Sequence, residues 1–257
     1  MWTDEELKSR IGQTVEWLRE RVREAKAKGL AVGISGGVDS AVVAGLCRQA
    51  FPDNCIGVIM PSHSAPEDKE DALLVAAGLQ MRTAEVDLSA VHTQILGQIQ
   101  ENMASLNCQI ENEKLIQGNL KARLRMSALY AVAGSLNYLV IGTDNEPESY
   151  IGYFTKYGDG GVDLQPLSSL TKTEVRAWAR VMGLPEKIAG RVPTAGFWPG
   201  QTDEGELGLS YDQVDRYLLG ESVPPEVRER VETLHRQSEH KRQIPPGFTL
   251  PKLKGLE

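Results

Sequence analysis

Residues 30–45 read LAVGISGGVDSAVVAG: an apolar stretch, a turn rich in glycine and serine, and a second apolar stretch. The first stretch, residues 30–34, predicts a short buried strand, and the Ala- and Val-rich residues 38–50 predict a buried helix. Further strands are expected at 55–60, 82–86 and 138–141, with helical patterns between them. Strands that alternate with helices predict an α/β fold with a doubly wound parallel sheet and right-handed crossovers.

Other segments carry helical periodicity or helix start and stop signals. The expected helices are 4–28, 66–78, 89–105, 112–135, 172–182, 211–219 and 224–240. Residues 142–166 and 190–208 are irregular and rich in glycine and charged residues, which predicts loops that carry function. We expect one α/β domain over residues 1–257, with these loops at its functional edge.

The composition favours a globular protein of the cytoplasm. The chain has 257 residues, with 28 basic and 35 acidic side chains and a net charge of −7. This acidic balance argues against a general affinity for nucleic acid. The three cysteines form no CxxC pair, which argues against a disulfide framework or a zinc site. No apolar run is long enough for a membrane span, and the acidic start is unlike a signal peptide.

The turn between the first strand and helix has the composition of an anion site. In an open parallel sheet, ligands bind beyond the carboxyl ends of the strands, where this turn lies. Gly36 and Gly37 permit backbone angles that let consecutive N–H groups converge, and a helix N-terminus follows them. Ser35 and Ser40 add hydroxyl donors. Asp39 would repel a phosphate unless a cation lay between them, so its presence predicts Mg²⁺.

Other interpretations of the turn fit less well. A capped turn without a ligand explains one serine or aspartate, but not the two glycines and two serines together. The GxxxxGK[ST] phosphate loop requires a lysine that this turn lacks, and the GxGxxG spacing of dinucleotide-binding proteins is not met.

The motif Ser35-Gly36-Gly37-Val38-Asp39-Ser40 resembles the SGGxDS loop of the ATP pyrophosphatases, which cleave ATP to AMP and pyrophosphate. This resemblance implies an adenine-nucleotide alpha-hydrolase-like (Rossmann-like) fold. The superfamily includes NAD, GMP, asparagine and argininosuccinate synthetases and several tRNA-modifying enzymes. The loop therefore identifies the superfamily and leaves the substrate open.

Downstream segments resemble the ammonia-dependent NAD synthetases. They read GTDNEPE at 142–148, GYFTKYGDGGVD at 152–163, PTA at 193–195 and HKR at 240–242. The resemblance implies a ligase that adenylates the nicotinate carboxylate of deamido-NAD with ATP, releases pyrophosphate, and lets ammonia displace AMP. It further implies a homodimer, for which the apolar stretch around residues 115–135 is the candidate interface helix.

The resemblance also assigns residues to sites. The ATP site would comprise Gly33, Ile34, Ser35, Gly36, Gly37, Val38, Asp39, Ser40, Thr143, Lys172 and Thr194. The deamido-NAD site would comprise Arg123, in preference to Arg125, with Lys156, Asp163, His240 and Lys241. Asp39 and Glu148 would bind Mg²⁺, and Asp159 would lie near the ammonia pocket as the catalytic candidate. Lys172 is independently notable, because a lysine in the first turn opposes the helix dipole.

Two segments depart from the family pattern: Asn145 stands where a histidine is common, and residues 61–66 read PSHSAP. About 30 residues precede the first strand, so we expect no glutaminase domain and free ammonia as the nitrogen source. The alternatives are another AMP-forming ligase, a tRNA-modifying pyrophosphatase, or a non-catalytic nucleotide-binding regulator. The acidic balance weighs against the tRNA enzyme, and the presence of Asp39, Glu148 and Lys172 weighs against the regulator.

Overall fold

The computed structural model describes residues 2–198 and 200–250, and its centre is a parallel sheet. The four strands are β1 (Gly29–Gly33), β2 (Cys55–Ile59), β3 (Thr83–Glu85) and β4 (Tyr138–Ile141). They lie in the order β3-β2-β1-β4, and every neighbouring pair is parallel. After β1 the chain first builds the sheet toward β3 and then returns to add β4 on the other side of β1. The predicted doubly wound parallel sheet is therefore confirmed, with its switch point between β1 and β4.

The long helices match the predicted positions closely. The helices are α1 (Asp4–Glu24), α2 (Val38–Ala50), α3 (Pro66–Gly78), α4 (Ser89–Ser105), α5 (Glu113–Leu136), α6 (Glu146–Ile151), α7 (Lys172–Val181), α8 (Glu186–Ala189), α9 (Asp203–Leu207), α10 (Tyr211–Leu218), α11 (Pro225–Gln237) and α12 (Glu239–Arg242). The first helix ends earlier than the predicted residue 28, because Lys26 adopts a left-handed φ of 53° that turns the chain into β1.

Three short helices were not expected. Within the predicted loops at 142–166 and 190–208 lie α6 and α9, and α8 follows α7. Each has only four to six residues, too few for a hydrophobic period to show in the sequence. End contacts hold two of them: the Asn145 side chain accepts a hydrogen bond from the Glu148 N–H, and that of Thr202 from the Gly205 N–H.

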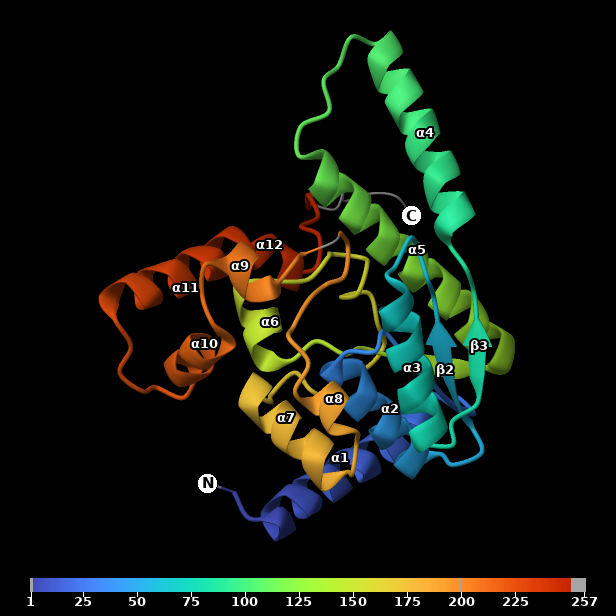
Figure 1. Cartoon of the computed structure of the whole chain (residues 1–257), viewed down its shortest axis with the longest axis vertical. Coiled ribbons are helices and arrows are strands. Elements are labelled where there is room, and N and C mark those ends of the chain that lie inside the picture. Colours follow the sequence, from blue (N-terminus) through green and yellow to red (C-terminus); the bar gives the residue numbers. More distant parts are fainter. Residues whose placement is uncertain (1, 199, 251–257) are drawn as a thin grey trace, which may run out of the picture.

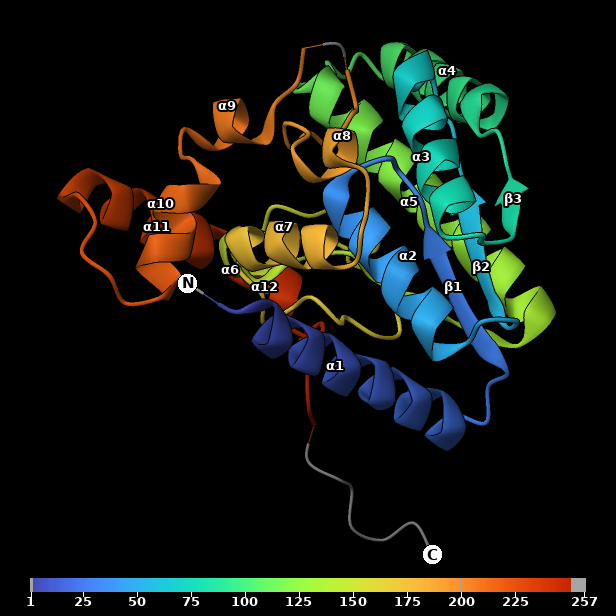
Figure 2. The same ribbon diagram turned by 60° about the horizontal axis from the view of Figure 1, so that its bottom comes forward.

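Helices cover both faces of the sheet (Figure 1). On one face α2 packs on β1, and α1 and α7 pack on α2, as the rotated view shows (Figure 2). This layer holds the main core, in which Leu18, Leu46 and Trp178 are buried. On the other face α5 packs on β1 and β4, where Leu129 and Ala133 meet the strands.

A second, smaller core lies among the C-terminal helices. Helix α10 contacts both α6 and α7, and α11 contacts α6 and α10 (Figure 1). The residues buried in this core are Ile151, Leu207, Leu209, Val214, Val227 and Val231. Through its contact with α7, helix α10 attaches the C-terminal helices to the layer of helices that packs on the sheet.

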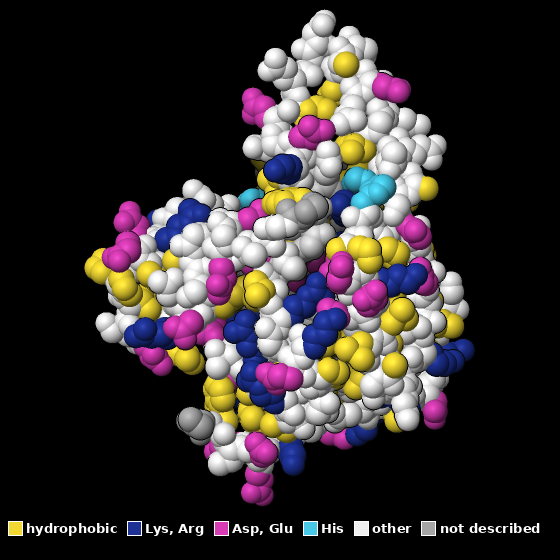
Figure 3. All heavy atoms as spheres, viewed as in Figure 1, with side chains coloured by type: hydrophobic (Ala, Val, Ile, Leu, Met, Phe, Trp, Pro, Cys, Tyr) yellow, Lys and Arg dark blue, Asp and Glu magenta, His cyan; other side chains and the backbone are white. Residues whose placement is uncertain are grey.

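Helices α4 and α5 form a hairpin that projects from the top of the molecule in Figure 1. Along α4 only His92 is buried. The same projection shows few charged side chains in the space-filling view (Figure 3). None of the described helices is long and apolar enough to cross a membrane.

Candidate active site

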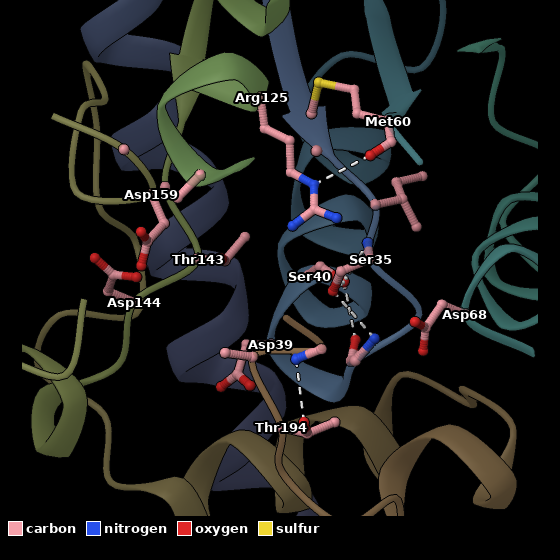
Figure 4. A pocket seen from close by; sticks show the side chains of 18 of the residues that line it. Ser35, Asp39, Ser40, Met60, Asp68, Arg125, Thr143, Asp144, Asp159 and Thr194 are labelled. Carbon is pink, nitrogen blue, oxygen red and sulfur yellow. Dashed lines mark hydrogen bonds between the residues drawn. The ribbon is translucent and has the colours of Figure 1, made fainter. Parts of the chain in front are cut away.

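A cavity of about 300 Å³ opens beyond the carboxyl ends of β1 and β4, at the switch point of the sheet. Its walls come from the turn before α2, the segment after β4, the first residue of α7 and residues 191–197. Segments that lie more than 100 residues apart in the sequence thus meet here, as expected for a doubly wound fold. Figure 4 shows the side chains that line it.

The turn before α2 forms one wall of the cavity. Gly36 adopts φ +83°, and a Cβ there would lie 2.8 Å from Cβ of Asp71. The hydroxyl of Ser40 accepts a hydrogen bond from the Ser35 N–H at 3.2 Å and donates to the Gly37 carbonyl at 3.0 Å. No side chain of a described residue caps the start of α2. The first N–H groups of this helix are therefore available to an anion, and the anion site stays a prediction.

Lys172 lies at the centre of a buried charge cluster. Only 2% of its side chain is exposed. Its Nζ donates to Oδ2 of Asp39 at 2.7 Å and to Oε1 of Glu148 at 3.0 Å. One cation therefore joins the first turn of α2, helix α6 and helix α7, and the two carboxylates that the sequence analysis assigned to Mg²⁺ converge on a single point.

Burial and the neighbouring opposite charges shift the pKa values of Glu148 and Lys172 in opposite directions. Burial raises the pKa of Glu148 to about 7, although the neighbouring Lys172 ammonium lowers it. Burial alone would lower the pKa of Lys172, but Asp39 and Glu148 raise it above its ordinary value. The lysine accordingly stays charged, and its ammonium is the cation that the two carboxylates share.

Helix α10 supports Lys172 from behind, a contribution that the sequence analysis missed. The Tyr211 ring centroid lies 4.7 Å from the lysine Nζ, and the tyrosine hydroxyl donates toward Glu148 at 3.2 Å and Asp203 at 3.1 Å. One turn further along α10, Asp215 accepts hydrogen bonds from the backbone N–H groups of Lys172 at 3.0 Å and Thr173 at 2.9 Å. This carboxylate offsets the unfavourable placement of a lysine at the positive end of a helix. The i, i+4 spacing of YDQVD was the available signal.

Asp144 and Asp159 form a second acidic pair on the opposite wall (Figure 4). Asp144 follows β4, and Asp159 lies in the 152–163 segment and accepts a hydrogen bond from the Thr155 N–H at 2.9 Å. Burial raises the pKa of Asp144 well above its ordinary value, and the charges of Asp159 and Glu148 raise it further. Burial also raises the pKa of Asp159. Such a pair favours binding of a small cation or a shared proton.

Most of the predicted ATP residues line this cavity. They are Gly33, Ile34, Ser35, Gly37, Val38, Asp39, Ser40, Thr143, Lys172 and Thr194. Gly36 lies just behind them, against α3. The end of the predicted 190–208 loop forms helix α9, where Asp203 is buried and accepts a hydrogen bond from the Tyr211 hydroxyl.

The five residues assigned to deamido-NAD lie outside this cavity. Arg123 donates to the Lys156 carbonyl at 3.3 Å, and Lys156 Nζ donates to the His240 carbonyl. Lys241 donates to the carbonyls of Gly152 at 2.8 Å and Phe154 at 2.7 Å, which holds the 152–163 segment in place.

Asp163 is the last of the five residues assigned to deamido-NAD. Its carboxylate accepts from the Tyr130 hydroxyl at 2.9 Å and from the Val140 N–H at 2.8 Å, so it joins α5 to β4. None of the five lines the cavity formed by the described residues.

Arg125, the arginine that the sequence analysis ranked second, is the one that lines the cavity. Its Nε donates to the Met60 carbonyl and its Nη2 to Ser64 Oγ, both at 3.1 Å. The guanidinium points toward Ser40 (Figure 4). The unusual 61–66 segment therefore serves to hold Arg125.

The donor set around Lys172 suits Mg²⁺. Carboxylate oxygens are hard ligands, and Mg²⁺ in nucleotide enzymes is commonly bound by one or two carboxylates together with substrate phosphates. Asp39 and Glu148 supply two carboxylates that already share one cation. Across residues 2–198 and 200–250 no group of three or more His, Cys, Asp or Glu side chains could bind a metal ion alone. The site therefore fits a cation completed by the nucleotide.

Comparisons with known proteins agree with this geometry. The profile of the NAD synthase family matches residues 10–245. The NH(3)-dependent NAD(+) synthetase of Alkaliphilus oremlandii is 50% identical over 94% of this chain and 97% of its own. The NMN synthetase of Francisella tularensis has a TM-score of 0.89 and 34% identity over 97% of this chain and 100% of its own. The NAD+ synthetase of Burkholderia pseudomallei has a TM-score of 0.76 and 31% identity over 93% and 91%. The chain belongs to the NAD synthase family.

Proposed function

We propose that this protein is a carbon–nitrogen ligase that makes NAD from deamido-NAD, ATP and ammonia, releasing AMP and pyrophosphate. The observation that carries the proposal is the convergence of Asp39, Glu148 and Lys172 beside a turn whose N–H groups suit a phosphate. Curated relatives with this activity in their names, at up to 51% identity over most of the chain, support it.

In the first step a nicotinate carboxylate oxygen attacks the α-phosphorus of ATP, and pyrophosphate leaves. Negative charge then grows on the β-phosphate. The N–H groups at the start of α2, the Ser35 hydroxyl and the Lys172 ammonium are fixed donors for that charge, and the Ser40 hydroxyl contacts that of Ser35 at 3.1 Å. Thr143 and Thr194 would contact the nucleotide from the two other walls.

Mg²⁺ is the cation we assign to Asp39 and Glu148. When bound there, it would neutralise the phosphate oxygens and stabilise the leaving pyrophosphate. Lys172 would then share the two carboxylates with it.

In the second step ammonia attacks the acyl carbon, and AMP leaves. The buried pair Asp144 and Asp159 is the candidate ammonia site, since raised carboxyl pKa values suit groups that hold ammonium and accept a proton. No protein nucleophile is required, so catalysis rests on alignment and electrostatics.

We further propose a homodimer in the cytoplasm, with deamido-NAD bound near Arg123, Lys156, Asp163, His240 and Lys241. The support for a dimer comes from the sheet face that α5 covers. Of the helix–strand contacts described above, α5 alone packs on β1 and β4 at that face. Helices α4 and α5, with the residue that follows α4, also expose apolar side chains: Val91, Ile99, Leu106, Leu115, Ile116 and Leu136. Light scattering of the purified protein would test this, and a monomer at micromolar concentration would contradict it.

A second substrate has a specific argument in its favour. The solved NMN synthetase superposes on this chain with a TM-score of 0.89. The acid that corresponds to NMN, nicotinate mononucleotide, is thus a candidate beside deamido-NAD, because the amidated group is the same in both.

The test is an assay of the purified protein with ATP, Mg²⁺ and ammonium. Parallel reactions receive deamido-NAD or nicotinate mononucleotide, and the amide, AMP and pyrophosphate are quantified. Formation of NAD and AMP in equal amounts is expected. Failure with both substrates would contradict the proposal, and equal activity with glutamine alone would contradict free ammonia as the nitrogen source.

A further inference from the structure

The Arg191 side chain contacts both helix α3 and the turn before α2, and the proposed mechanism gives it no role. Its Nη1 donates to the Gly36 carbonyl at 3.2 Å and to Asp71 Oδ2 at 3.1 Å, and its Nη2 donates to Asp68. The residue follows α8 and begins the stretch that carries Thr194. One guanidinium therefore connects α3, the turn before α2 and one cavity wall.

The bond to Gly36 fixes the orientation of a peptide group. In a trans peptide the carbonyl and the N–H point in opposite directions. Because Arg191 holds the Gly36 carbonyl on the α3 side, the Gly37 N–H is directed away from α3. Gly37 lines the cavity, and its N–H donates a hydrogen bond at 3.2 Å to Oγ of Ser35, another cavity residue.

Glycine itself does not impose this orientation. At φ +83° Gly36 is in the left-handed region, where it has many accessible conformations. A flipped peptide would present a carbonyl oxygen to the phosphate and remove a donor. The Ser35 hydroxyl accepts from the N–H end of this peptide, and Arg191 holds its carbonyl end. The planar fork of the arginine bonds this carbonyl, Asp71 and Asp68 at once.

The surroundings of Arg191 distinguish it from an ordinary ion pair. Its side chain is 23% exposed and Asp71 only 5%, and both Arg191 and Asp68 line the cavity. Lys187 pairs with the other oxygen of Asp71, but 61% of that lysine is exposed. Asp71 thus binds two cations, of which only Arg191 contacts the turn.

We propose that Arg191 is a positioning residue for phosphate binding, which acts by holding the Gly36–Gly37 peptide with its N–H toward the cavity. The proposal deepens the proposed function, since it concerns the pyrophosphate part of the same site. It assigns to Arg191 an effect on ATP and pyrophosphate, and none on deamido-NAD.

The experiment compares Arg191→Gln with the matched variant Lys187→Gln. Each removes one positive charge from Asp71, and only the first frees the Gly36 carbonyl. Pyrophosphate binding is measured by calorimetry with Mg²⁺, and KM is measured separately for ATP and deamido-NAD. Arg191→Gln should weaken pyrophosphate binding and raise the KM for ATP by about tenfold or more, as expected for a lost bond from a charged donor. Lys187→Gln should change both by less than about twofold.

Adding Asp68→Asn to Arg191→Gln separates positioning from charge screening. If Arg191 only shields phosphate from Asp68, the second change restores binding, and that result would overturn the proposal. Equal effects of the Arg191 and Lys187 variants, or a KM for deamido-NAD that rises as much as that for ATP, would also overturn it. Binding that stays weak in the double variant supports it.

Two controls keep the result interpretable. Melting temperatures of all variants are measured. If Arg191→Gln does not fold, Arg191→Lys takes its place. This variant should keep the melting temperature of the wild type and lose part of its affinity for pyrophosphate. Wild-type protein that binds pyrophosphate but does not form NAD or NMN would contradict the proposed function alone. Active wild-type protein with an unaffected Arg191→Gln variant would contradict this inference alone.

Discussion

Replacing Lys172 by methionine should destabilise the protein in a manner that depends on pH and Mg²⁺. The substitution keeps the side chain's length and apolar stem, and removes the charge. Asp39 and Glu148, which are 18% and 13% exposed, would then face each other without the cation that both bind. Removal of one partner from a buried ion pair costs about 3–5 kcal/mol.

For a chain of this size, that loss corresponds to a fall in melting temperature of about 6–20 °C. The fall should be largest above pH 7. Glu148 has a pKa of about 7 in the folded protein, above that of an unfolded glutamate, so the folded state binds the additional proton. Stability from this group therefore decreases as the pH rises through 7, and without Lys172 the decrease is steeper.

Thermal melts at pH 6, 7 and 8, with and without Mg²⁺, test the reasoning. Mg²⁺ should raise the melting temperature of Lys172→Met more than that of the wild type, because it replaces the missing charge. The control is Lys69→Met, since Lys69 pairs with Glu85 at 2.6 Å on the surface, with 42% and 45% exposed. That pair is worth about 1 kcal/mol or less. If Lys172→Met melted within about 2 °C of the wild type at pH 8, the lysine would not neutralise these carboxylates.

Three further predictions concern single residues of the site. Asp39→Asn should keep the fold, as judged by circular dichroism, and lower turnover by about a hundredfold or more, since it removes charge from the proposed metal site; near-normal rates would remove Asp39 from that site. Gly36→Ala should weaken ATP binding and lower stability more than Gly183→Ala, because both glycines have positive φ but a Cβ meets other atoms within 4 Å only at Gly36. Asp144→Asn should raise stability at pH 8 and leave it unchanged below pH 4, because the raised pKa of Asp144 makes the folded state lose stability as the pH rises. Chemical denaturation at both pH values measures the difference. Equal stability of the variant and the wild type at pH 8 would contradict the prediction.

The sheet and the long helices could be predicted because their residues are buried on one face or throughout. Leu7, Ile11, Val15, Leu18 and Val22 are all buried along α1, at the spacing that the sequence displays. The short helices could not be predicted, since α6 and α9 depend on end caps and tertiary contacts rather than on a hydrophobic period. Element ends also moved where a left-handed residue, such as Lys26, stops a helix.

The site shows the same division. Residues of the turn and of the cluster around Lys172 belong to short continuous motifs, so their meeting at one cavity could be predicted. Tyr211 and Arg191 act through contacts with segments 63 and 155 residues away, which no local pattern records. Arg125 was predictable in principle. Arg125, Leu129 and Ala133 follow one another at i, i+4 spacing, so the buried positions place Arg125 on the inner face of α5.

The support that α10 gives to Lys172 makes catalytic competence a property of tertiary assembly. The turn before α2 and the sheet belong to the main core, whereas Tyr211 and Asp215 belong to the helices built around the smaller one. Local opening of α10 would release the lysine while the sheet remained folded. Mild heating or low denaturant should therefore abolish turnover before far-UV ellipticity changes, and the protein would lose its activity in a state that still retains most of its secondary structure.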